Sequence, residues 1–120
     1  MNAIRKRITP LENKFITKLI DRLESTEGIV ALILYGSRVH GFSNEDSDLD
    51  IALVTNKSLP YHKLNSIKDA IMEEMDILGE LRIDLFGFTE EEIKHLPIGK
   101  EIERKGALLW KKDWNLQKAS

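Results

Sequence analysis

The sequence predicts an α/β (α+β) domain in which helices flank a small mixed β-sheet. Two observations carry this prediction. Segments with apolar residues at helical spacing alternate along the chain with short apolar, β-branched runs. The link between the first two strand-like runs, residues 36–47, has twelve residues, which is the lower limit of the dozen or more that a crossover between parallel neighbours normally needs. We therefore expect the first two strands to run antiparallel and the sheet to be mixed.

The N-terminal half begins with an expected helix over residues 10–25. Thr9 is its predicted N-cap, Pro follows in the first turn, and Glu12 can reach back to the cap in a capping box. Residues 29–35, "IVALILY", form a continuous apolar run, which is typical of a strand buried on both faces. Residues 36–47 are polar and contain two glycines, which indicates a loop or a short helical turn.

The remaining pattern completes a single predicted domain, residues 1–120. Residues 48–55 alternate between apolar and other side chains, as a half-buried strand does. The later elements are expected as a helix at 60–76, a strand at 80–88, a helix from a Thr89 capping box to just before Pro97, a helix at 98–106 and a short strand at 107–110. The C-terminal tail, about residues 112–120, is expected to fray.

Composition narrows the class of protein. Hydrophobic residues make up 42% of the chain and charged residues 32%, which is ordinary for a globular domain. The net charge of −2 provides no basic field for general binding of nucleic acid backbones. The chain contains no cysteine, so disulfides, thiolate metal sites and thiol nucleophiles are excluded. With no signal-peptide or membrane-spanning pattern, we expect a cytoplasmic protein that makes no use of a membrane.

Three aspartates are the candidate catalytic and metal-binding residues. Asp48 and Asp50 lie two positions apart on a strand, so their side chains point to the same face, roughly 7 Å apart. Asp84 stands in the middle of the later strand 80–88 and joins them if the two strands are neighbours. Such carboxylates suit Mg²⁺, with Mn²⁺ as the alternative, and two such ions can clamp an in-line phosphoryl-type displacement.

A glycine-serine pair at the end of the first strand is the candidate nucleotide-binding element. Gly36 lets the backbone approach a phosphate closely, and the amides after it, with the Ser37 hydroxyl, can donate to phosphate oxygens. Arg38 can add a cationic contact to the same anion. We expect this loop to deliver the triphosphate of a nucleotide to the metal ions held by the aspartates.

Together these residues resemble a known motif. The segment "GSRVHGFSNEDSDLD", residues 36–50, is similar to the glycine-serine, ten-residue spacer, Asp-x-Asp signature of the DNA polymerase β-like nucleotidyltransferase superfamily. Asp84 matches its third carboxylate on a later strand. The single-domain size and the "GSRxxG…SDxD" form most resemble the minimal nucleotidyltransferases, the MNT family, and the likeness covers essentially the whole chain.

The resemblance implies an activity and partners. It implies the polymerase β-like fold and transfer of a nucleoside monophosphate, with ATP the expected donor. Asp48 and Asp50 would bind both metal ions, Asp84 would bind one and help to activate the acceptor hydroxyl, and Ser37 would contact the outer phosphates. MNT proteins are commonly antitoxins paired with a HEPN-domain toxin, and they can AMPylate a tyrosine of that ribonuclease. Larger relatives carry a second helical domain that grips the base or the acceptor. We expect a HEPN partner, or a second copy of the chain in a homodimer, to supply this part of the site.

Plainer explanations exist for each residue taken singly. Asp48 could be a turn residue, Asp50 could face solvent on an edge strand, and Asp84 could pair with Arg82. Two alternative functions stay open: an antitoxin that neutralises its HEPN partner by binding alone, and a transferase that modifies a small molecule. The sequence specifies neither the nucleotide preference, the acceptor, the number of nucleotides added nor the oligomeric state.

Overall fold

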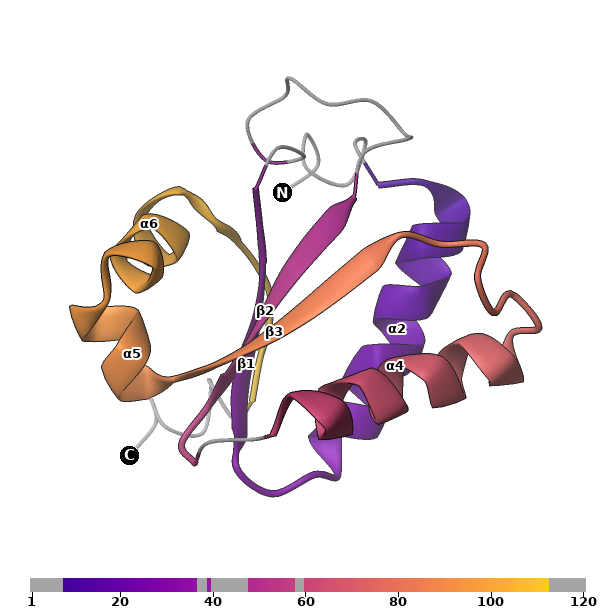
Figure 1. The fold of residues 1–120 in the computed structure, drawn as a ribbon, viewed down its shortest axis with the longest axis horizontal. Helices are drawn as coiled ribbons and strands as arrows, with labels where there is room; N and C mark the ends of the chain where they lie inside the picture. Colours follow the sequence, from indigo (N-terminus) through magenta and orange to yellow (C-terminus); the bar gives the residue numbers. More distant parts are fainter. Residues whose placement is uncertain (1–7, 37–38, 40–47, 58–59, 113–120) are drawn as a thin grey trace.

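The computed structural model describes residues 8–36, 39, 48–57 and 60–112, and in them a four-stranded sheet lies between two pairs of helices (Figure 1). The sheet has the order β3-β2-β1-β4. Its strands are β1 (Ile29–Tyr35), β2 (Leu49–Thr55), β3 (Ile83–Thr89) and β4 (Ala107–Lys111). β1 runs antiparallel to both β2 and β4, whereas β2 and β3 are parallel. The predicted antiparallel first pair and mixed sheet are confirmed.

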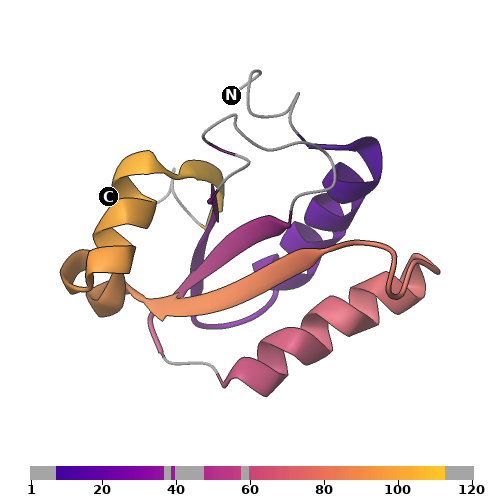
Figure 2. The same cartoon turned by 45° about the horizontal axis from the view of Figure 1, so that its top comes forward.

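The described helices divide between the two faces of the sheet. They are α2 (Pro10–Glu24), α4 (Tyr61–Glu74), α5 (Glu90–His95) and α6 (Pro97–Lys105). Figures 1 and 2 show α2 and α4 together on one side of the strands and α5 and α6 on the other. None of the helices described is long and apolar enough to cross a membrane.

Two capping boxes begin helices where the sequence predicted them. At α2, the Thr9 hydroxyl accepts from the Glu12 amide at 3.1 Å, and the Glu12 carboxylate accepts from the Thr9 amide at 2.9 Å. Thr89 and Glu92 make the same reciprocal pair at α5, at 3.1 Å and 2.8 Å. Each box satisfies amides that the first turn of a helix leaves without an internal acceptor.

The segment between α4 and β3 differs from the predicted boundaries. The helix predicted at 60–76 ends at Glu74, and the strand predicted at 80–88 begins only at Ile83. The intervening backbone turns instead: Ile77 donates to the Met72 carbonyl and Glu80 donates to the Ile77 carbonyl, both at 2.9 Å. The Glu80 amide is thus used within the turn, and the described pairing with β2 begins only where Leu49 lies opposite Ile83, so the strand-like alternation around residue 80 does not extend the sheet.

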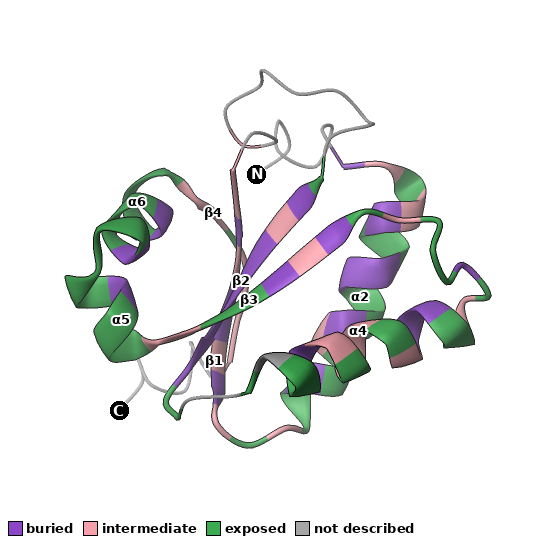
Figure 3. Cartoon of the chain, in the orientation of Figure 1, coloured by how far each residue is buried: buried purple, intermediate pink, exposed green. Residues whose placement is uncertain are grey.

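The face under α2 and α4 holds the larger core (Figure 3). Leu49, Ile51 and Leu53 point into it from β2, as the alternation of residues 48–55 predicted. It is completed by apolar residues from the helices and the other strands, including Phe15, Ile16, Leu19, Leu23, Leu32, Leu34, Leu64, Ile71, Ile83 and Leu85. Because side chains alternate along a strand, burying these residues on one face places the residues between them on the opposite face.

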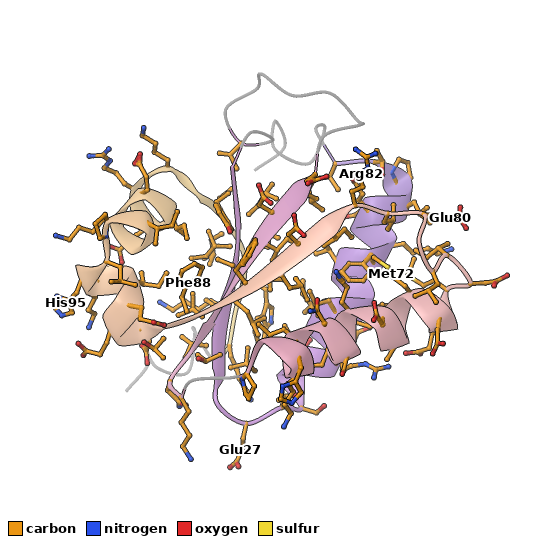
Figure 4. All side chains as sticks on the ribbon, viewed as in Figure 1. Glu27, Met72, Glu80, Arg82, Phe88 and His95 are labelled. Carbon is orange, nitrogen blue, oxygen red and sulfur yellow. The ribbon has the colours of Figure 1, made fainter. Side chains whose placement is uncertain are left out.

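The opposite face carries a smaller apolar cluster that covers only part of it. Ala52 and Val54 of β2 pack there with Ile93 of α5 and Ile102 of α6. Phe88 joins the cluster from β3, and Figure 4 shows it beside α5, away from Met72 on α4. The part of this face where β1 ends and where β2 and β3 begin is the place of the candidate site.

Candidate active site

Three polar side chains form a row across the sheet at this end. In the register of the strands, Tyr35 of β1 is the partner of Asp50 of β2, and Asp50 is the partner of Asp84 of β3. Because side chains alternate along a strand, Asp50 lies on the face opposite Leu49 and Ile51, which are buried in the larger core. The expectation that the two aspartate-bearing strands are neighbours is therefore confirmed, and Asp50 and Asp84 stand side by side.

The charges in this row are not balanced within the described residues. Asp48 lies exposed one residue before β2, while Asp50 and Asp84 are partly buried. Burial raises the pKa of the Asp50 carboxyl, and the negative charges of Asp84 and then Asp48 raise it further. In the described part of the chain, the ion pairs join other residues, and Asp84 makes none with Arg82. The row thus lacks a described cation.

The backbone at Gly36 lies directly against Asp50. Gly36 has a φ of +82°, a conformation that favours glycine, and its carbonyl accepts from the Val39 amide at 3.1 Å in a turn. A Cβ atom at this position would overlap the Asp50 carboxylate, lying 3.2 Å from its Cγ. Only glycine lets the chain leave β1 this close to the carboxylate. The other two predicted nucleotide-binding residues, Ser37 and Arg38, lie outside the described residues.

Tyr35 is a site residue that the sequence reasoning missed. Burial raises the pKa of its phenol to about 12, helped by the charges of Asp50 and then Asp84. Its ring meets that of Phe86 edge to face, with centroids 6.4 Å apart, although β1 and β3 lie on either side of β2. The two rings therefore lean toward each other across β2. The alternation of residues 29–35 could have placed Tyr35 on this face, but not beside Asp50.

Comparison with known families identifies the domain. The family profile described as "Polymerase beta, Nucleotidyltransferase" matches residues 17–115. The chain belongs to this nucleotidyltransferase family. The match includes β1, β2 and β3 with all three candidate aspartates, so the family assignment and the row of side chains concern the same part of the molecule. No curated protein matches the sequence of this nucleotidyltransferase.

Solved structures share the fold of the nucleotidyltransferase at low sequence identity. One, a nucleotidyltransferase from Sulfolobus solfataricus, is 18% identical with a TM-score of 0.54, over 84% of this chain and 81% of that one. A toxin-antitoxin complex with AMP-PNP gives 18% and 0.57, over 87% and 77%. A tri-AMPylated Shewanella oneidensis HEPN toxin in complex with an MNT antitoxin gives 19% and 0.52, over 88% and 73%. The likeness shows that the chain shares the fold of these proteins.

The donor set of the nucleotidyltransferase fits a divalent metal ion. Asp48, Asp50 and Asp84 offer only carboxylate oxygens, the ligands that Mg²⁺ prefers. A bound cation would offset the repulsion that adds to burial in raising the pKa of Asp50. Across the described residues, no three Asp, Glu, His or Cys side chains are grouped closely enough to enclose a metal as they stand. The three aspartates are thus coupled electrostatically at one end of the sheet without forming a closed ligand sphere.

Proposed function

We propose that the protein transfers a nucleoside monophosphate, AMP from ATP, to a hydroxyl group, and that Asp48, Asp50 and Asp84 are its catalytic and metal-binding residues. The observation that carries this proposal is the register that pairs Asp50 with Asp84 on adjacent parallel strands, inside the segment matched by the nucleotidyltransferase family. The unbalanced negative charge of this pair supports a site for Mg²⁺, or Mn²⁺ in its place.

Each residue has a distinct part in the proposed reaction. Asp48 and Asp50 would hold the metal ions, which would supply positive charge to the triphosphate and to the reacting oxygens. Gly36 lets the donor phosphates approach the backbone, and Ser37 and Arg38 supply the contacts to them. Asp84, at the start of the edge strand β3, faces the acceptor side and takes the proton from the acceptor hydroxyl.

The bonds change in a single displacement. The acceptor oxygen attacks the α-phosphorus in line with the leaving group, and its proton passes to the Asp84 carboxylate. The bond between the α-phosphorus and the oxygen that bridges to the β-phosphate breaks. Pyrophosphate leaves, and the acceptor keeps the nucleoside monophosphate through a phosphodiester bond.

We further propose that the acceptor is a tyrosine of a HEPN-domain toxin and that the protein acts as its antitoxin. This part of the proposal draws on the structural neighbours, one of which is an MNT antitoxin bound to a tri-AMPylated HEPN toxin. Another is a toxin-antitoxin complex with AMP-PNP. A HEPN partner would also supply a further wall for the acceptor side of the site, which lies at the edge of the sheet.

The test is a labelling experiment with the wild type and two variants of the chain. The wild type, Asp84→Asn and Asp50→Asn are each incubated with α-labelled ATP, Mg²⁺ and the HEPN-domain protein that co-purifies with the chain. The wild type should place AMP on a tyrosine of that protein, located by mass spectrometry. Asp84→Asn should lower the rate by about 10²–10⁴-fold because it removes a general base, and Asp50→Asn should abolish transfer.

A matched control is Asp69→Asn, which makes the same chemical change on the exposed surface of α4. It should label the partner at the wild-type rate. Transfer by Asp50→Asn at the wild-type rate would contradict the catalytic proposal. A tight complex in which neither protein carries label would instead identify an antitoxin that acts by binding, and label on an added small molecule alone would identify a different acceptor.

A further inference from the structure

A cavity of about 240 Å³ lies between the end of β1 and helix α6. Tyr35 and Gly36 line it from the strand, and Ile98 and Ile102 line it from the helix. Glu101, Lys105 and Gly106 complete the lining. Glu101 and Lys105 form an ion pair of 3.1 Å, and both side chains are about half exposed, so they lie at the mouth. The interior of the cavity is therefore apolar and partly aromatic, with a hydrogen-bond acceptor and a donor at its opening.

Two glycines fix the helix that forms the outer wall. A Cβ at Gly106 would lie 2.6 Å from the Ile33 Cγ2 atom, so only glycine lets the end of α6 approach β1 this closely. A Cβ at Gly99 would lie 2.6 Å from the Ile93 Cα atom, so α6 also packs tightly on α5. Ile102 anchors the same helix in the smaller apolar cluster and is 1% exposed. Contacts with β1, with α5 and with the smaller apolar cluster therefore hold α6, the outer wall of the cavity, in place.

The cavity and the aspartate row share a wall. Tyr35 lines the cavity and is also the register partner of Asp50. Gly36, the next residue, lines the cavity too, and its backbone lies against the Asp50 carboxylate. A molecule that sits in the cavity therefore lies beside the end of β1 that carries the register partner of Asp50.

We propose that this cavity binds the nucleobase of the donor nucleoside triphosphate. The inference rests on the proposed function and deepens it by naming where the base of the donor is recognised. The apolar walls suit the faces of a base, and the Glu101–Lys105 pair at the mouth can accept from and donate to its polar edge. The aromatic ring of Tyr35 adds an edge or face contact of the kind that bases favour.

The geometry of the reaction disfavours the acceptor as occupant. In an in-line displacement, the attacking oxygen approaches from the side opposite the leaving pyrophosphate. The cavity lies next to the end of β1 and to Gly36, where the proposed phosphate loop begins, so it lies on the donor side of the proposed site. Asp84, the proposed acceptor base, lies two strands away on β3. The base of the donor, which hangs off the line of attack, can occupy the cavity without obstructing the acceptor.

The test uses two ligands and a matched pair of variants. Leu96 and Ile98 are exposed aliphatic residues on either side of Pro97, 41% and 49% exposed, but only Ile98 lines the cavity. ATP and inorganic tripolyphosphate, each with Mg²⁺, are titrated calorimetrically into the wild type, Ile98→Trp and Leu96→Trp. Ile98→Trp should fill the cavity and weaken ATP binding about tenfold, leaving the Kd of tripolyphosphate within about twofold because that ligand has no base. Leu96→Trp should change neither Kd.

A second variant guards against a folding defect. Ile98→Ala removes apolar contact without adding bulk and should weaken ATP about fivefold while sparing tripolyphosphate. Unchanged ATP binding by both Ile98 variants would overturn the nucleobase subsite, and an equal loss of both ligands would assign the cavity to phosphate instead. Failure of the proposed function looks different: wild type would then bind neither ligand with Mg²⁺, or Asp50→Asn would bind them as well as wild type does.

Discussion

The two faces of the sheet differ in how completely they are covered. On the face of α2 and α4, Leu49, Ile51 and Leu53 of β2 are buried, and apolar residues of the two helices pack over them (Figure 3). On the face of α5 and α6, small residues such as Ala31 and Ala52 pack against the helices at one end, and Asp50 and Asp84 occupy the other. The helices thus leave one end of this face for polar residues.

The covered face of the sheet stabilises the fold, whereas the uncovered end of the other face carries the candidate site. The covered face holds the strands in register, because a shift of one residue would turn its leucines and isoleucines to the other side. That fixed register is what brings Asp50 of β2 beside Asp84 of β3. The open end can then carry repelling carboxylates at a cost that the covered face offsets. Substitutions on the two faces should accordingly affect different measurements.

The largest effect on stability is expected from Leu32→Ala. Leu32 is fully buried on β1 under α2 and α4, and the truncation should lower the free energy of unfolding by about 3 kcal/mol through lost burial and a residual cavity. Leu108→Ala is the matched change on β4, where the side chain is 51% exposed, and should cost less than about 1 kcal/mol. Urea denaturation compares the two. Equal losses would contradict the contrast between the faces.

A smaller loss is expected from Gly36→Ala, with Gly79→Ala as its control. Both glycines have positive φ angles, +82° and +85°, so alanine should cost about 1 kcal/mol of backbone strain at either position. An added Cβ meets nothing within 4 Å at Gly79 but overlaps the Asp50 carboxylate at Gly36. Gly36→Ala should therefore cost about 2 kcal/mol in thermal or urea unfolding and displace Asp50. Indistinguishable losses would show that Gly36 is not needed for the close approach.

The smallest effect is expected in the pH dependence of stability without divalent ions. Burial and the neighbouring carboxylates raise the pKa of Asp50 above its ordinary value of 3.8, so the folded state holds this proton more tightly than the unfolded state does. The associated stability is present below pH 3.8 and is lost as the pH rises through the folded pKa. Asp50→Asn should remove this loss, so its stability relative to wild type should rise between acid and neutral pH.

This comparison is made by urea unfolding in EDTA across the acid-to-neutral range. Asp21→Asn, on the exposed surface of α2, serves as the control and should keep the wild-type pH profile. A variant at Asp50 whose stability runs parallel to that of wild type at every pH would contradict the electrostatic account of the site.

Local sequence signals sufficed for most of the fold. Each capping box, at Thr9 and at Thr89, joins residues only three positions apart, so it can be predicted without knowing the tertiary structure. The antiparallel first pair followed from the length of one connection. The start of β3 was misplaced because its described pairing with β2 begins only where Leu49 lies opposite Ile83, and alternation of residue types does not report where the pairing starts.

The candidate site was predictable only in part. Gly36, Asp48, Asp50 and Asp84 stand out because charged or glycine residues interrupt apolar runs at a known spacing. Tyr35 was missed because its place depends on the register between β1 and β2, which no local pattern specifies. The cavity beside it was equally hidden, since its outer wall comes from α6, a helix about sixty residues later in the chain.

Gly99, in the first turn of α6, has a consequence for ligand selectivity. At Gly99, α6 packs directly against the backbone of α5, so this contact sets the spacing of the two helices. A larger side chain at position 99 would overlap the backbone of α5 and should shift α6, which would alter the cavity between β1 and α6. The width of the proposed nucleobase cavity is therefore controlled by Gly99, a residue that does not line the cavity.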